Sequence, residues 1–206
     1  MRADGTAAPG RGTSWPPART ALSILAAAVA LGGCRAEDPE PPFELPAGAR
    51  PVGAGPRFAP PLAARPVPDC RPGPLGERFG VHLELFGDDK VVILPAGIGT
   101  EPPRGLTAGR ISSAGCFGPL VTIDPTGLLL LRPGTSATVG DVFALWGRPL
   151  TRRRAASFRG RVRAYVDGRR VTGHPGAIPL RRHENVVLQV GPFVPPHADY
   201  VFPEQF

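Results

Sequence analysis

The sequence predicts an α+β domain that is mainly β, with about seven short antiparallel strands in hairpins and one helix near residues 139–146. Three observations lead to this fold class. Short segments alternate apolar and polar residues with the two-residue period of a half-buried strand. Turn-forming Asp, Gly and Pro separate these segments, as is typical of hairpins. Only one stretch combines helical spacing of apolar residues with a capping residue before it and a glycine after it.

The chain begins with the pattern of a secretory signal peptide, residues 1–33. Arg2, Arg11 and Arg19 precede an apolar run, Ala21–Gly33, that ends in small residues. This order of positive charge, apolar run and small residues is typical of export signals. As a helix the run would extend about 20 Å, which is too short for the roughly 30 Å hydrocarbon core, so a permanent membrane span is not expected.

The last four residues of this region, Leu31-Gly32-Gly33-Cys34, resemble the lipobox of bacterial lipoproteins. The resemblance implies that a diacylglyceryl group is attached to Cys34 and that the leader is cleaved before it. Palmitate-type acyl chains would then anchor the protein at the extracytoplasmic face of the cell membrane, where two or more chains hold stably. The alternative is an ordinary signal peptide that is cleaved nearby, with Cys34 present by chance.

Residues 34–66 are predicted to be the lipidated cysteine and a disordered tether. Proline, alanine and glycine recur throughout, and no apolar period of a helix or a strand is present. This composition favours a partly extended polyproline II chain, which keeps the following domain, residues 67–192, clear of the membrane.

The folded domain opens with a predicted β-hairpin. Phe79–Phe86 has an apolar residue at every second position, Gly87-Asp88-Asp89 supplies the turn, and Lys90–Leu94 is the returning strand. A second pair of strands follows, Leu120–Asp124 and Leu128–Leu131, separated by a turn that contains proline and glycine.

Val139–Trp146 is the expected helix. Thr138 is a good N-cap, and Asp141 three residues later gives an arrangement like a capping box. Apolar residues recur on one face of this segment, as is typical of a helix packed on a sheet. Gly147 ends the helix.

Three further segments complete the predicted domain and its tail. Arg161–Val166 alternates charged and apolar residues, Asp167-Gly168 is a strong two-residue hairpin turn, and Arg169–Thr172 returns. Asn185–Val190 is the last expected strand. The aromatic and proline-rich tail, residues 193–206, either packs over the domain or stays loose.

The charge of the chain limits its partners. The formal net charge of +7 falls to +5 without the leader, because the leader carries three arginines and one aspartate. Moderate positive charge suits contact with anionic lipid, a cell-wall polymer or an acidic protein. Because the chain is expected to be exported, nucleic acid is not an expected partner.

The cysteines indicate a disulfide. If Cys34 carries lipid, Cys70 and Cys116 remain as an even pair in an oxidising compartment. A disulfide that closes a loop of this length stabilises a fold by roughly 4 kcal/mol in the chain-entropy model, less any strain. The alternative is two free, buried thiols.

From Cys70 onward the sequence resembles an uncharacterised family of secreted bacterial proteins with no established activity. The resembling segments are Val81–Leu83, Pro95–Gly99, Leu120–Gly127 after Cys116, Val139–Gly147, Tyr165–Gly168, Ile178–Leu180 and His183-Glu184. The first strand of that family carries the pattern H-x-H-x-H-L, and the strand after the second cysteine carries H-T-H-D. Alternating histidines on facing strands would suit a Cu or Zn ion.

This chain keeps little of that pattern. His82 holds the last position of the first motif, with Arg78 and Gly80 at the two histidine positions before it. Asp124 alone remains of the second motif, and His183 falls where the family also has histidine. The resemblance therefore implies either a metal site reduced to His82, Asp124 and His183 or a site that has been lost. We expect loss, and so no cofactor; a half-buried histidine, a turn-forming aspartate and a loop histidine would then be ordinary features.

Seven arginines and no acidic residue occur between residues 148 and 163. One interpretation is a surface for anionic headgroups, teichoic-type polymers or an acidic partner, whose binding would weaken with salt. The other is a solvated loop and strand face in an arginine-rich protein. The seven residues are Arg148, Arg152, Arg153, Arg154, Arg159, Arg161 and Arg163.

The sequence contains no recognisable catalytic constellation. No serine lies in a G-x-S-x-G motif, and H-E-x-x-H, C-x-x-C and phosphate-loop motifs are absent. The sequence therefore predicts a non-enzymatic binding or interaction module, anchored by lipid at the extracytoplasmic face of the cell membrane. The alternative function is a Cu- or Zn-binding extracytoplasmic protein.

Overall fold

The computed structural model describes residues 66–107 and 109–206, all within one of the chain's two compact units, Glu44–Phe206. The predicted leader, the predicted lipidation site Cys34 and the predicted tether up to residue 65 lie outside the described residues. None of the helices in the described part is long and apolar enough to cross a membrane.

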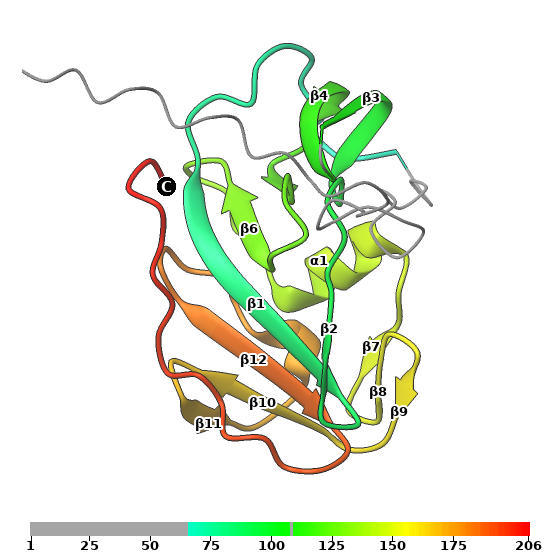
Figure 1. Ribbon diagram of the computed structural model, residues 1–206, viewed down its shortest axis with the longest axis vertical. Helices are drawn as coiled ribbons and strands as arrows, with labels where there is room; N and C mark the ends of the chain where they lie inside the picture. Colours follow the sequence, from blue (N-terminus) through cyan, green and yellow to red (C-terminus); the bar gives the residue numbers. More distant parts are fainter. Residues whose placement is uncertain (1–65, 108) are drawn as a thin grey trace, which may run out of the picture. The chain divides into compact units, whose positions relative to one another are not determined.

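A mixed sheet of seven strands forms the centre of the domain (Figure 1). The strands are β1 (Phe79–Gly87), β2 (Lys90–Val92), β5 (Leu120–Val121), β6 (Leu128–Leu131), β10 (Val162–Val166), β11 (Arg169–Val171) and β12 (Asn185–Val190). They lie in the order β11-β10-β12-β1-β6-β5, and β2 pairs with β1. β1 and β12 run parallel, with His82 opposite Asn185, whereas the other pairs of this sheet are antiparallel. A strand from each end of the domain thus lies at the centre of its sheet.

Two small sheets were not predicted from the sequence. One is the hairpin of β3 (Thr100–Thr107) and β4 (Arg110–Phe117), and the other consists of β7 (Leu150–Thr151), β8 (Arg154–Ala155) and β9 (Phe158–Arg159). β3 contains two prolines, and β7 to β9 have two residues each, so neither sheet carries a periodic apolar signal. The predicted fold class is confirmed for the described residues, with twelve strands in place of about seven.

The one α-helix of the described residues, α1 (Val139–Trp146), is confirmed together with its capping. The Thr138 hydroxyl accepts a hydrogen bond from the Asp141 amide, and the Asp141 carboxylate accepts one from the Thr138 amide. Gly147 ends the helix in the left-handed conformation, with φ of 68°. A residue without a Cβ adopts this conformation at little cost, so both ends of α1 are set by local sequence.

The main core lies between α1 and one face of the sheet. Alternate residues of β1 (Phe79, Val81, Leu83 and Leu85) point into this core, as their spacing predicts. From α1, the core receives Val139, Val142, Phe143 and Trp146.

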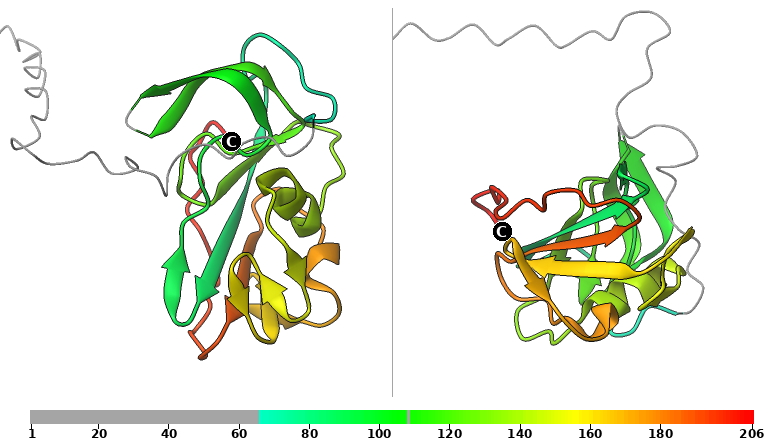
Figure 2. Two further views of the ribbon diagram at one scale, coloured as in Figure 1. Left: turned by 90° about the vertical axis from the view of Figure 1, so that its right-hand side faces the viewer. Right: turned by 90° about the horizontal axis from the view of Figure 1, so that it is seen from below.

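The other face of the sheet is covered by the C-terminal strap, residues 193–206 (Figures 1 and 2). Val194 packs against Phe86 and neighbouring aromatic and apolar side chains of the sheet, and Phe202 packs on the second apolar cluster. Gly80 of β1 leaves room for the strap, because a Cβ at this position would lie 2.8 Å from the Phe202 ring. Of the two alternatives for the tail, packing over the domain is the one observed.

The predicted disulfide is present. Cys70 and Cys116 form it, with their Cα atoms 5.4 Å apart. Beside it, Arg71 and Phe117 exchange two backbone hydrogen bonds of 3.0 and 2.9 Å. The segment that precedes β1 is thereby fastened to the end of β4.

Candidate functional site

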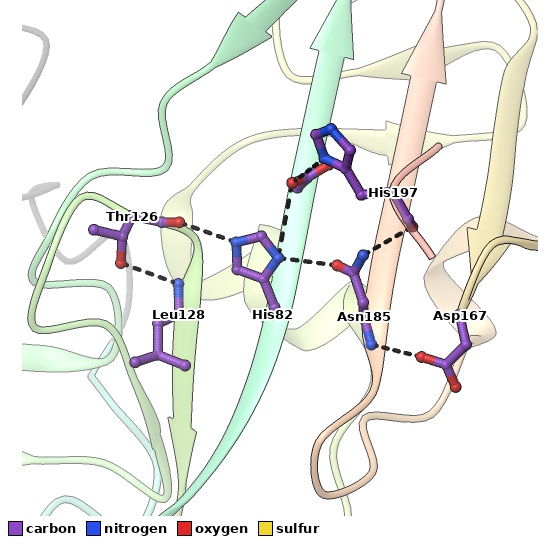
Figure 3. Close-up of polar contacts among 7 residues, drawn as sticks. His82, Thr126, Leu128, Asp167, Asn185 and His197 are labelled. Atoms are coloured by element: carbon purple, nitrogen blue, oxygen red, sulfur yellow. Dashed lines mark hydrogen bonds and ion pairs between the residues drawn. The ribbon is translucent and has the colours of Figure 1, made fainter. Parts of the chain in front are cut away.

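His82 was expected either to hold a metal or to be an ordinary half-buried residue of its strand. Its side chain lies on the strap side of β1, and the residue is 5% exposed. Nδ1 lies 2.9 Å from the Asn185 amide oxygen, and Nε2 lies 3.2 Å from the Thr126 carbonyl oxygen (Figure 3). The Tyr200 ring stacks on the imidazole at 3.8 Å. Both ring nitrogens therefore face oxygen atoms of the protein.

The other two residues of the predicted metal set have separate partners. The Asp124 carboxylate forms an ion pair of 2.7 Å with Arg110. His183 Nε2 lies 2.7 Å from the carbonyl oxygen of Phe206, and its ring stacks on Phe202 at 4.8 Å. His183 therefore contacts the C-terminal strap.

The structure does not bring His82, Asp124 and His183 together around one point. Within residues 66–107 and 109–206, one group of three or more His, Cys, Asp or Glu side chains has its ligand atoms within 4.8 Å of one another, and it consists of Cys70, Glu101 and Cys116. The two cysteines of that group form the disulfide, so they offer no thiolate to a metal.

A polar network that sequence reasoning missed surrounds His82. The Glu84 carboxylate lies 2.9 and 3.0 Å from His197 Nδ1, and the Asn185 amide donates a 2.9 Å hydrogen bond to the His197 carbonyl (Figure 3). Burial, and then the negative charge of Asp124, raise the pKa of the Tyr200 phenol. The alternation of β1 places Glu84 on the same face as His82, and this was the signal that could have identified Glu84. The network fastens the C-terminal strap to the two central strands.

The predicted arginine surface centres on a chain reversal, residues 152–161, which we call the arginine hairpin. Arg154 and Arg159 are cross-strand partners in β8 and β9. The Gly160 amide donates a 3.0 Å hydrogen bond to the Arg153 carbonyl, and the Val162 amide donates one of 2.9 Å to the Arg152 carbonyl. Backbone pairing thus brings the two arginine-rich segments side by side.

The seven predicted arginines differ in how they are held. Arg154 donates to the Ala156 carbonyl, and Arg163 donates to the carbonyls of Gly191 and Pro192. In the described part of the chain, the other five are exposed and have neither a side-chain hydrogen bond nor an acidic partner within ion-pair distance. These five are Arg148, Arg152, Arg153, Arg159 and Arg161.

An apolar cavity of about 380 Å³ lies beside α1, with Leu120 and Leu145 in its wall. Its lining includes two charged side chains. Asp141 serves the capping box, and Arg104 donates to both oxygens of Thr100. A cavity of this size suits a small ligand, but the charged groups that would orient a ligand here are engaged within the fold.

No protein-family model matches the chain, and searches of curated proteins and of solved structures gave no significant match.

Proposed function

We propose that this chain is a lipid-anchored, extracytoplasmic, non-enzymatic binding module whose arginine hairpin contacts the anionic phospholipid headgroups of the membrane that holds it. The observation that carries the proposal is the group of five exposed arginines without acidic partners, on and beside the arginine hairpin. Guanidinium groups bind phosphate oxygens in a bidentate manner, so arginine is well suited to headgroup phosphates.

Electrostatics favours the membrane as the partner. Each basic residue near an anionic leaflet contributes about 1 kcal/mol, so a few arginines together give a contact that salt weakens. The anchor predicted at Cys34 would keep the anionic leaflet within a tether's length of the domain. A contact that is weak in solution then becomes effective, because tethering raises the local concentration of the partner.

The histidines support a non-enzymatic role, since each of the four has a structural contact. His82, His183 and His197 hold the C-terminal strap. His174 caps the short 3-10 helix η2 (Pro175–Ala177) by accepting a hydrogen bond from the Gly176 amide. These contacts account for the imidazoles without a reaction, and the Cu- or Zn-binding alternative stays a prediction.

The proposal is tested with the chain from residue 35 onward, exported behind a cleavable leader so that Cys70 and Cys116 can pair. This chain contains the whole compact unit that begins at Glu44. It should co-sediment with equimolar phosphatidylglycerol and phosphatidylcholine vesicles, much less with pure phosphatidylcholine, and should dissociate at high salt. Binding to a teichoic-type polymer without binding to anionic vesicles would contradict the choice of partner.

The anchor is tested with the full chain. The protein extracted from membranes should carry the mass of a diacylglyceryl group at Cys34, and Cys34→Ser should release it to the soluble fraction. A membrane-bound protein of unmodified mass would contradict the anchor and leave the vesicle result standing.

A further inference from the structure

Three arginines meet at a cavity of about 390 Å³ at the start of β1, far from the arginine hairpin. Arg78 comes directly before β1, Arg132 directly follows β6, and Arg71 lies beside the disulfide. β1 and β6 are antiparallel with Phe79 opposite Leu131, so the register places Arg78 opposite Arg132. The arginine hairpin lies near the other end of β1, where a Cβ at Gly87 would meet the Phe158 ring.

These charges are placed close together without neutralisation. Arg78 is 4% exposed, and burial followed by the positive charges of Arg132 and Arg71 lowers its pKa to about 10, so it remains a cation at neutral pH. Like charges opposite each other on neighbouring strands are destabilising, and buried charges are normally paired. Within the described residues none of the three arginines forms an ion pair.

The hydrogen bonds of Arg78 fix its position without balancing its charge. Nε donates to the Leu75 carbonyl at 3.0 Å, and Nη1 donates to the carbonyls of Gly118 and Pro119 at 2.8 and 3.1 Å. Nη2 has no hydrogen-bond partner in the described part of the chain, and the residue lines the cavity. A guanidinium held by three neutral carbonyls is thus oriented, with a donor still to be used.

The other two arginines also keep donor capacity. Arg132 makes only long contacts, of 3.2 to 3.4 Å, with the carbonyls of Phe117 and Asp69. Arg71 is exposed, and its side chain makes no hydrogen bond with the described residues. One acid, Glu77, lines the cavity and pairs with none of the three arginines.

We propose that this cavity binds the phosphate group of an organic phosphate. A phosphate dianion and the Glu77 carboxylate would together balance the charge of the three guanidinium groups, and charge-assisted hydrogen bonds would hold the phosphate. The remaining wall is largely apolar, with Pro74, Leu75, Phe117 and Pro133, and it accepts a compact apolar group attached to the phosphate. The disulfide beside Arg71 braces this wall.

The proposal is tested by calorimetric titration of the chain from residue 35 onward with inorganic phosphate and with phenyl phosphate at constant ionic strength. Both should bind one to one, and phenyl phosphate should bind about tenfold more tightly because its ring contacts the apolar wall. A soluble short-chain phosphatidylglycerol forms the third arm. If it binds more tightly than phenyl phosphate, the phosphate that the cavity recognises belongs to a lipid headgroup. No saturable binding in any of the three arms would overturn the proposal.

Matched variants separate a specific site from general charge. Arg71→Gln should weaken phosphate binding about tenfold at unchanged thermal stability, because this side chain makes no hydrogen bond that the fold needs. Arg152→Gln removes the same charge from the arginine hairpin and should leave phosphate binding unchanged. Equal losses in the two variants would overturn the proposal. Where phenyl phosphate is the tighter ligand, Arg71→Gln should also keep vesicle binding, so failure here and failure of the proposed membrane contact are distinguishable.

Discussion

At the residue scale, two positions on the strap side of β1, residues 80 and 82, show what became of the predicted histidine pattern. His82 remains, but its ring is covered by Tyr200, and both its nitrogens face protein oxygens. Gly80 stands at a position where the predicted pattern H-x-H-x-H-L would place a histidine, and the Phe202 ring occupies the space that a side chain at this position would need. The strap therefore covers the side of β1 that carries His82.

Gly80→Ala should therefore loosen the strap. The new Cβ would lie 2.8 Å from Phe202, and relieving this overlap is expected to cost about 1–3 kcal/mol of unfolding free energy, measured in urea. In a Phe202→Ala background the same change should cost much less, because the overlapping ring is gone. Equal costs in the two backgrounds would show that the strap does not pack on Gly80.

A metal titration addresses the histidines directly. Because each imidazole is engaged and the ligand atoms of His82, Asp124 and His183 do not converge, we expect no stoichiometric binding of Cu or Zn and no change in thermal stability with chelator. Elemental analysis of the purified chain provides the measurement. Stoichiometric metal that is lost in His82→Ala would restore the metal-binding alternative.

At the element scale, the success of sequence reasoning depends on how local the signal is. α1 was predicted with its bounds because Thr138, Asp141 and Gly147 encode both ends within a few residues. The hairpin turn at Asp167-Gly168 was likewise local. β3 and the strands β7 to β9 pair with neighbours in the chain, but β3 contains two prolines and β7 to β9 have two residues each, so none shows a periodic apolar pattern.

Thr138→Ala tests the capping of α1. The substitution removes the hydroxyl that accepts from the Asp141 amide and donates to the Asp141 carboxylate, and it should lower the unfolding free energy by about 1 kcal/mol in urea denaturation. Ser136→Ala is the control, because this exposed serine makes no hydrogen bond with the described residues, and it should change the unfolding free energy by less than about 0.5 kcal/mol. Similar costs for both substitutions would argue against the cap.

At the scale of the whole molecule, long-range pairing determines where the candidate sites lie. β1 and β12 come from the two ends of the domain yet pair in the centre of the sheet, and this register sets His82 opposite Asn185. No local pattern contains that information, so sequence reasoning could propose His82 but could not identify Asn185 or Tyr200 as its partners. The arginine-rich segment could be recognised in the sequence as a run of charges. The cavity lined by Arg71, Arg78 and Arg132 could be recognised only in the structure, because these residues are far apart in the sequence.

The two proposed anion contacts also differ in kind. The arginine hairpin is an exposed surface, so its binding would depend on the charge of the membrane and on the salt concentration. The arginine cavity holds one buried cation in fixed geometry and would select a single phosphate group. A membrane-anchored module with both would combine a general contact with a specific one.

The central claim is that the arginine hairpin is the membrane contact, and vesicle co-sedimentation of two matched double variants tests it most directly. Arg152→Gln with Arg153→Gln should weaken binding to anionic vesicles about thirtyfold, since each arginine near the surface contributes about 1 kcal/mol. Arg169→Gln with Arg170→Gln removes the same charge from two exposed, adjacent residues of β11 and should leave binding nearly unchanged. Equal losses in the two variants would mean that net charge alone governs binding and would contradict the account.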